Sequence, residues 1–442
     1  MTEKCIALVL SLLILWQAYV VRKLVGTWLF PACLFGLFWF ALTFIPLVVL
    51  WSVPIEPYAI GFILLCVSAF SASFLFFDWK PAFERNAKRG DPQAVYGSRF
   101  LKRAFYVSVA ASLVLIVLNS LAQGITLYDL AFNLFGSAQA YAGLRFSDQL
   151  ASVSVERWSI VCAYLGAIIG GLRFSCASPK RQRLIIGLSF LPSVLIALTQ
   201  SAKWHFFLSI VFFYSGVLAY RVSSGRLHLI GRGRIRSLTI YAGIVLLIAT
   251  TSFLSRGLYA SDRSVVIHGL TASFASYSSG HIYAFSDWFA FVIGRHSELA
   301  YSHETASHGF YTFATLFRVM GSQRVLPIGV YEDYYSYGDL LTTNVFTMFR
   351  GLILDFGFVG SVLFMSVVGV LFHGIFYTML SSKRPVFTVV AFIFMMGYFY
   401  SSFVVSMFGS NIIYYVTFAL MCIALYANKK SRSTYTAPLQ SS

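Results

Sequence analysis

Apolar runs of about 20 residues recur along this chain of 442 residues, and this is the length that an α-helix needs to cross a bilayer. Backbone groups in lipid must be hydrogen-bonded within the segment, and the ten-residue alternation of an outer-membrane barrel is not present. Helices are therefore the expected spanning element. Eleven spans are expected, at residues 5–21, 25–50, 58–77, 104–122, 158–173, 184–200, 204–220, 238–255, 351–380, 386–407 and 411–427.

Composition supports an integral membrane protein. The chain is 58% hydrophobic and 11% charged, whereas a soluble domain carries about 25% charged residues. The expected fold class is an all-α polytopic membrane protein. The ninth run, 351–380, is long enough to contain a tilt or a turn outside the membrane.

Basic residues predict the orientation. The loops after spans 1, 3, 5, 7 and 9, together with the C-terminal tail, hold 23 of the 33 Lys and Arg residues. The positive-inside rule makes this side cytoplasmic, so the N-terminus is expected outside and the C-terminus inside. The same distribution argues against nucleic acid as a partner, because the excess charge is spread over short loops beside the spans.

Long outer segments divide the chain. We expect spans 1–8 within 1–255, with an outer loop at 124–157, then a large outer loop at 256–350. Spans 9–11 follow at 351–427, and 428–442 is a cytoplasmic tail. Loops this long are usually functional or disordered, and the aromatic content of 256–350 argues against disorder. Helices are expected at 264–291 and 311–320, with a turn-rich surface at 327–339.

Arg350 and Asp355 form the first candidate site, because ionisable groups at the edge of an apolar helix are expensive to bury and often functional. Five residues apart on a regular helix, they do not share one face. Each side chain is therefore expected to interact with a different group. A planar guanidinium suits a diphosphate. The alternative is a snorkelling Arg and an Asp at a helix end.

Other outer cations are candidates for the same anion. Lys203 lies where two spans meet with almost no loop, and Arg256 follows span 8 directly. The alternative is anchoring at the interface beside Trp204. The weaker candidates are Arg145, Arg263, Arg318 and Arg324.

Proton acceptors and sugar contacts are expected in the large outer loop. His281 and Asp287 are each able to accept a proton from a hydroxyl, unless they are a core histidine and a helix cap. Aromatic and acidic residues gather at 331–339, where Tyr334, Tyr335 and Asp339 suit a glycan cleft or an ordinary interfacial turn. The spacing of His303, Glu304 and His308 does not match a zinc helix, so neither a metal nor another cofactor is expected.

The segment 344–360 resembles a pattern of the Wzy-type O-antigen and capsule repeat-unit polymerases. That pattern is Asn-Val-(Tyr/Phe)-Thr-x-(Phe/Tyr)-Arg, followed by Asp-Phe-Gly and a further Gly. The matching residues are Asn344, Val345, Phe346, Thr347, Phe349, Arg350, Asp355, Phe356, Gly357 and Gly360. The segments 280–287 and 201–203 are similar to further elements of the family, with Lys203 standing where many members have Arg.

The resemblance implies a metal-independent membrane glycosyltransferase with a GT-C-like helical bundle and a large periplasmic loop, located in a bacterial inner membrane. A growing glycan on undecaprenyl diphosphate would be the donor, and a single lipid-linked repeat unit the acceptor. Asn344, Arg350, Lys203 and Arg256 would bind substrate, with Arg318, Tyr334, Tyr335 and Asp339. Asp287, His281 or Asp355 would take the proton. A chain-length-regulating co-polymerase is the implied protein partner.

Two other functions remain open at this point. An O-antigen ligase uses the same donor but transfers the glycan to lipid A–core. A transporter or flippase of the lipid-linked unit is the alternative from another class. The long outer loop and the nearly uncharged middle of each span argue against a flippase.

Overall fold

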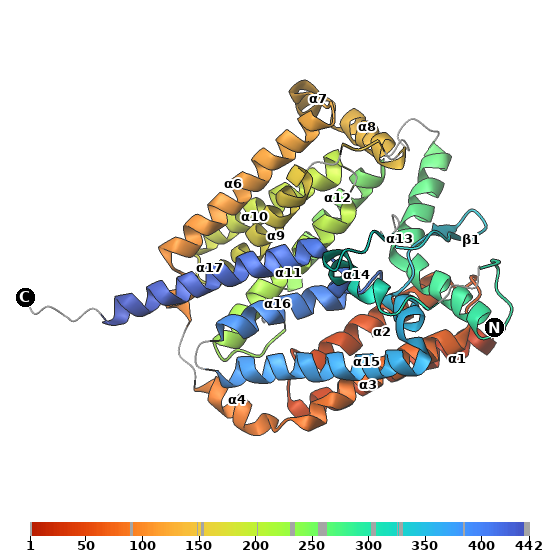
Figure 1. The fold of residues 1–442 in the computed structure, drawn as a ribbon, viewed down its shortest axis with the longest axis horizontal. Coiled ribbons are helices and arrows are strands. Elements are labelled where there is room, and N and C mark those ends of the chain that lie inside the picture. Colours follow the sequence, from red (N-terminus) through yellow and green to blue (C-terminus); the bar gives the residue numbers. More distant parts are fainter. Residues whose placement is uncertain are drawn as a thin grey trace, which may run out of the picture. The chain divides into compact units, whose positions relative to one another are not determined.

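The computed structural model describes residues 2–88, 92–147, 149–151, 154–200, 202–229, 235–254, 263–301, 306–324, 326, 330–382 and 385–436. The protein is an all-α polytopic membrane protein apart from one small hairpin (Figure 1). Nine helices in these ranges are long and apolar enough to cross a membrane. They match nine of the eleven expected spans. At the eighth and tenth positions the apolar helical segments are shorter: Ala242–Leu254, which is part of the helix Ile235–Leu254, and Val386–Ser401.

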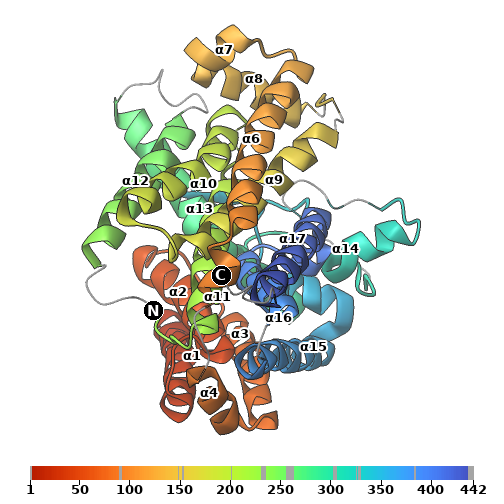
Figure 2. The same cartoon turned by 90° about the vertical axis from the view of Figure 1, so that its left-hand side faces the viewer.

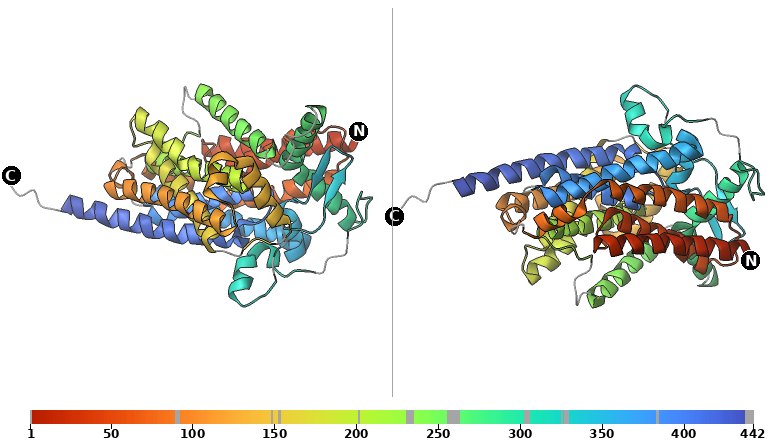
Figure 3. Two further views of the ribbon diagram at one scale, coloured as in Figure 1. Left: turned by 90° about the horizontal axis from the view of Figure 1, so that it is seen from above. Right: turned by 90° about the horizontal axis from the view of Figure 1, so that it is seen from below.

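The chain forms two compact units, and the first comprises Met1–Pro81, Ile267–Tyr377 and Tyr398–Asn411. Three N-terminal helices, α1, α2 and α3, pack against one another in this unit (Figure 3). Its elements are α1 (Thr2–Val25), α2 (Pro31–Val49), α3 (Pro57–Ala72), η1 (Ser73–Phe76), α14 (Phe310–Val319), β1 (Tyr335–Tyr337), β2 (Leu341–Thr343), η3 (Met407–Gly409), and most of α13 (Arg263–Val292) and α15 (Met348–Ser381).

The second unit comprises Ala82–Val266, Thr378–Gly397 and Ile412–Ser442. Helices α6 and α9 lie side by side in it (Figure 2). Its elements are α5 (Gln93–Tyr96), α6 (Arg99–Ala122), α7 (Leu127–Phe132), α8 (Leu134–Phe146), α9 (Ser154–Phe174), α10 (Pro179–Thr199), α11 (Lys203–Ser223), α12 (Ile235–Leu254), and most of α4 (Trp79–Ala87), α16 (Val386–Ser401) and α17 (Asn411–Thr436).

Glycines bring α9 and α11 into close contact in the second unit. A Cβ atom added at Gly171 would lie 1.9 Å from the Phe213 carbonyl oxygen, and one at Gly216 would lie 2.6 Å from that of Ile168. Small residues let membrane helices approach this closely. The glycines at 171 and 216 therefore form part of the packing surface between these two helices.

Both expected helices of the large outer loop are present, as α13 and α14. The turn-rich surface expected at 327–339 is partly wrong. Residues 335–343 form a hairpin in which Tyr335 pairs with Thr343, and Tyr335 and Tyr331 are buried. The hairpin packs on α13 at Gly280, where an added Cβ would lie 2.8 Å from the Thr343 side chain.

Helix α15 is interrupted at Gly357, which has φ 69° and ψ −178°. This conformation is accessible almost only to glycine. The interruption separates a short N-terminal segment, 348–356, from the long apolar segment that follows. The ninth apolar run therefore does contain a local break, and Arg350 and Asp355 both precede it.

Candidate functional site

Arg350 lies in the short segment of α15 before the break at Gly357, and its side chain is completely buried. A buried guanidinium needs a compensating charge and hydrogen bonds, because its loss of hydration is costly. Its Nη2 atom donates a hydrogen bond to the carboxylate of Asp333 and forms an ion pair with it. Arg350 is thus a paired internal cation, and snorkelling toward solvent does not describe it.

Four aromatic rings surround the same guanidinium. Its Cζ atom lies 4.2 Å from the ring centroids of Tyr331 and Phe346, 5.1 Å from Trp288 and 5.7 Å from Tyr301. Cations within about 6 Å of an aromatic face are attracted by the ring quadrupole, more strongly where water is excluded. We call these four rings the aromatic box. The box and Asp333 together hold Arg350 in place.

Asp333 is the more accessible member of the ion pair. Its side chain is 29% exposed, whereas that of Arg350 is 0% exposed. It belongs to the segment just before β1, which also supplies Tyr331 to the aromatic box. This segment therefore covers the guanidinium with one ring and one carboxylate.

Asp287 is joined to the aromatic box through Tyr301. Its carboxylate accepts hydrogen bonds from the Tyr301 hydroxyl at 2.9 Å and from the backbone N–H groups of Glu298 at 2.6 Å and Leu299 at 3.4 Å. Burial raises the pKa of Asp287 above its ordinary value, and these hydrogen bonds oppose the shift. Burial also raises the pKa of Tyr301, with the Asp287 charge adding to it. The hydrogen bond to Asp287 therefore holds the Tyr301 ring in its place in the aromatic box.

Asp355 has a different set of partners, as expected from its separation from Arg350 around the helix. Its carboxylate accepts hydrogen bonds from the Ser307 hydroxyl and from the backbone N–H groups of Tyr311 at 3.1 Å and Thr312 at 2.6 Å. These two N–H groups belong to the first turn of α14, where backbone N–H groups have no acceptor within the helix itself. Asp355 therefore caps α14 and anchors the turn before it.

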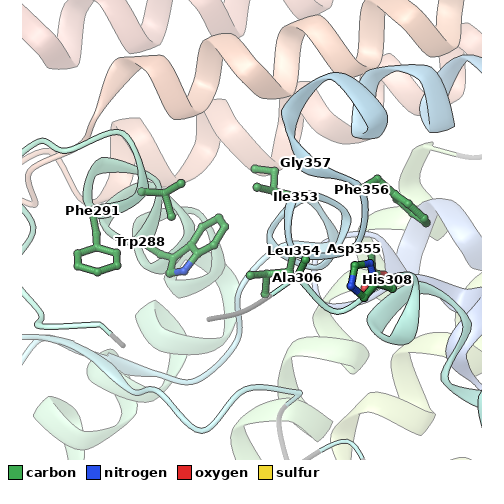
Figure 4. Close-up of a pocket in the computed structure, with 10 residues that line it drawn as sticks. Trp288, Phe291, Ala306, His308, Ile353, Leu354, Asp355, Phe356 and Gly357 are labelled. Carbon is green, nitrogen blue, oxygen red and sulfur yellow. The ribbon is translucent and has the colours of Figure 1, made fainter. Parts of the chain in front are cut away.

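A cavity of about 500 Å³ lies beside these groups. Trp288 and Phe291 of α13 lie on one side, with His308 and Asp355 toward the other (Figure 4). Small-molecule sites typically have this size and combine apolar walls with a few polar groups. The complete lining is Trp288, Phe291, Val292, Ala306, His308, Ile353, Leu354, Asp355, Phe356 and Gly357.

Asp287 lines a second cavity, which has a volume of about 340 Å³. Arg295 pairs with Glu56 at its edge, with N–O distances of 3.0 and 2.9 Å. The remaining lining is Glu3, Pro54, Ile55, Ser286, Asp287, Ala290, His296, Glu298 and Tyr335. Among the described residues, no three His, Cys, Asp or Glu side chains are placed to hold a metal ion.

Some predicted site residues lie elsewhere in the first unit. His281 is buried, with its ring 5.4 Å from that of Phe403, and it lines neither cavity described above. Tyr334, Asp339 and Arg318 are exposed, and Asn344 is half-buried. Of the predicted glycan contacts at 331–339, Tyr335 lines a cavity, the smaller one.

Of the two stronger cation candidates besides Arg350, one is in the second unit and the other is outside the described residues. Lys203 begins α11, is buried, and has its ammonium 3.5 Å from the centroid of the Phe253 ring. Arg256 lies outside the described residues.

Sequence reasoning missed several residues that complete the site. Asp333 was placed only in a glycan-binding turn, and Trp288, Tyr301 and His308 were not included. The alternation of aromatic and acidic residues around Asp333 was the available signal. It could not identify Arg350 as the partner, because the contact joins two segments separated by the hairpin.

Comparisons with known proteins find no matching family model, no matching curated protein and no matching solved structure.

Proposed function

We propose that this protein polymerises undecaprenyl-diphosphate-linked oligosaccharide repeat units into O-antigen or a capsule-type polysaccharide. A hydroxyl of the incoming repeat unit attacks the anomeric carbon of the growing chain, and undecaprenyl diphosphate leaves. The reaction takes place at the outer face of a bacterial inner membrane. The orientation follows from the basic loops, with the C-terminus in the cytoplasm and the segment 256–350 in the periplasm.

Arg350 is the observation that carries this proposal. A fully buried guanidinium is expensive to desolvate. This one packs on the ring of Trp288, which lines the larger cavity, and it stands just before the long apolar part of α15. A lipid diphosphate carries its charge next to its apolar chain. A cation in this position stabilises the negative charge that develops on the diphosphate as it leaves.

The Asp333 carboxylate acts in this scheme as the resident partner of Arg350. Diphosphate oxygens compete for the same guanidinium donors, and two of them match its planar geometry. Asp333 is partly exposed, so it is the member of the pair that moves when an anion arrives. The aromatic box keeps Arg350 oriented during the exchange.

The test is a polysaccharide gel from the source bacterium, a strain lacking the gene, and the complemented strain. Single-repeat glycan in the deletion, with the long ladder restored by the gene, is the expected result. Complete loss of capped glycan would favour a ligase or a flippase instead. An unchanged ladder would contradict all three functions. The presence of a co-polymerase would be tested in the same strains by co-purification.

A further inference from the structure

We propose that His308 accepts the proton from the attacking hydroxyl in the cavity of about 500 Å³. The inference rests on the polymerase function proposed above. It assigns the base to a residue that the sequence suggested only as a metal ligand, in place of Asp287, His281 or Asp355.

The polar side chains of the cavity differ in whether they can take a proton. The Trp288 indole can only donate a hydrogen bond. Asp355 already accepts hydrogen bonds from Ser307, Tyr311 and Thr312 at the start of α14. Within the described part of the chain, the His308 imidazole has no recorded hydrogen bond, and the residue is exposed to the cavity. A neutral imidazole has one nitrogen that accepts a proton.

The turn that carries His308 is tightly anchored. Ser307 donates from its backbone N–H to the Leu354 carbonyl at 2.9 Å and from its hydroxyl to Asp355. The Phe310 N–H closes the turn onto the Ser307 carbonyl at 3.1 Å. The backbone that carries the imidazole is therefore fixed by hydrogen bonds on both sides of His308.

The backbone of His308 has φ 49° and is followed by Gly309 with φ 94°. Left-handed conformations are uncommon for residues with a side chain, and His, like Asn and Asp, adopts them more often than most. His308 therefore suits this turn, and it also lines the cavity.

The walls opposite His308 fit a sugar. Trp288 and Phe291 offer aromatic surfaces to the C–H face of a pyranose ring (Figure 4). The acceptor hydroxyl then loses its proton to the imidazole nitrogen while its oxygen bonds to the anomeric carbon. The bond from that carbon to the diphosphate oxygen breaks, its electron pair leaves with the diphosphate, and the imidazolium returns its proton to water.

The left-handed backbone at residue 308 can be kept in variants that lack the imidazole. His308→Gly removes the imidazole and suits φ 49°, and His308→Asn tolerates the same backbone without being able to take a proton. His268→Ala is the matched control, because His268 is an exposed histidine of α13 that lines neither cavity.

The assay uses full-length protein in lipid nanodiscs and lipid-linked repeat units extracted from the deletion strain, with product length read on a gel. Both His308 variants are expected to lose about 100-fold or more in rate, the scale of general base catalysis. Added imidazole should restore His308→Gly in part, and His268→Ala should match the wild type.

Each other outcome has a distinct meaning. Wild-type protein that fails to lengthen the extracted units would overturn the proposed function itself. An active wild type with equally active His308→Gly and His308→Asn would overturn only the role of His308. Variants that never accumulate in the membrane, or inactive His308→Gly that imidazole does not restore, would assign His308 a structural role and overturn the proposal as well.

Discussion

Arg350 and Asp333 form an ion pair in which the cation is completely buried and the carboxylate side chain is 29% exposed. The pair joins the start of α15 to the segment before β1, with the whole hairpin between them in sequence. Four aromatic rings hold the guanidinium in place. We therefore expect the Asp333 side chain, and not Arg350, to move when the pair opens.

Replacing Arg350 by Ala should abolish long glycan chains in the complemented deletion strain. Arg350→Lys should also be strongly impaired, because an ammonium cannot make the planar double contact of a guanidinium. The glycan gel is the readout, with Arg85→Ala, an exposed arginine of α4, as the control. A full ladder from Arg350→Ala at normal protein level would refute the role of Arg350.

Asp333→Asn should lower the stability of the purified protein but increase its stabilisation by pyrophosphate. Losing the charged partner of a buried cation should lower stability by about 1–3 kcal/mol. Inorganic pyrophosphate should then raise the thermal unfolding temperature more in the variant than in the wild type, because the guanidinium is open to another anion. Asp78→Asn, at an exposed position, serves as the control. An equal response to pyrophosphate in both proteins would contradict the exchange of partners.

Asp355→Asn should loosen the start of α14. The amide keeps one acceptor oxygen but brings an N–H₂ group against N–H donors, so we expect a local loss of about 1–3 kcal/mol. Hydrogen exchange of residues 306–319 should accelerate, while the exposed variant Asp339→Asn should leave it unchanged. Unaltered exchange would mean that the turn is held without the carboxylate.

Gly357→Ala should lower the unfolding temperature, because φ 69° with ψ −178° is strained for any residue that has a Cβ atom. The expected cost is about 1–3 kcal/mol. Gly187→Ala is the matched control, since Gly187 lies in helix α10 with no atom within 4 Å of the added Cβ. Equal unfolding temperatures for the two variants would argue that α15 straightens at this position.

The predicted orientation can be checked with Cys176, which lies between α9 and α10 and is not part of a disulfide. In a variant that retains only this cysteine, a membrane-impermeant maleimide should label inverted vesicles but not intact spheroplasts. Arg318→Cys in the same background should label from the outside. The reverse pattern would place the large loop in the cytoplasm and remove the basis for a periplasmic reaction.

Local patterns predicted the helices well and the hairpin poorly. The apolar runs identified all nine long spans, and apolar periodicity placed α13 and α14 within a few residues. The hairpin was missed because its strands, at 335–337 and 341–343, are three residues each. Such short strands depend on packing against α13 rather than on intrinsic preference.

The candidate site also has a part that the sequence predicts and a part that it does not. Arg350 was predicted because a charge beside an apolar run is visible in the sequence, and its separation from Asp355 follows from helical geometry. The partners were not predictable in this way. Asp333 reaches Arg350 across the hairpin, and Asp355 reaches α14 from a segment more than 40 residues away.

The sequence by itself determined that this chain has the apolar spans of a polytopic membrane protein, where its long helices lie to within a few residues, and that a cation stands at the start of the ninth run. These properties depend on hydrophobic length and local periodicity, which neighbouring residues encode. Only the tertiary structure decided that Asp333 and four rings enclose Arg350, that Asp355 caps α14, and that His308 faces a cavity. Those facts depend on contacts between distant segments, which form only when the packed chain brings them together.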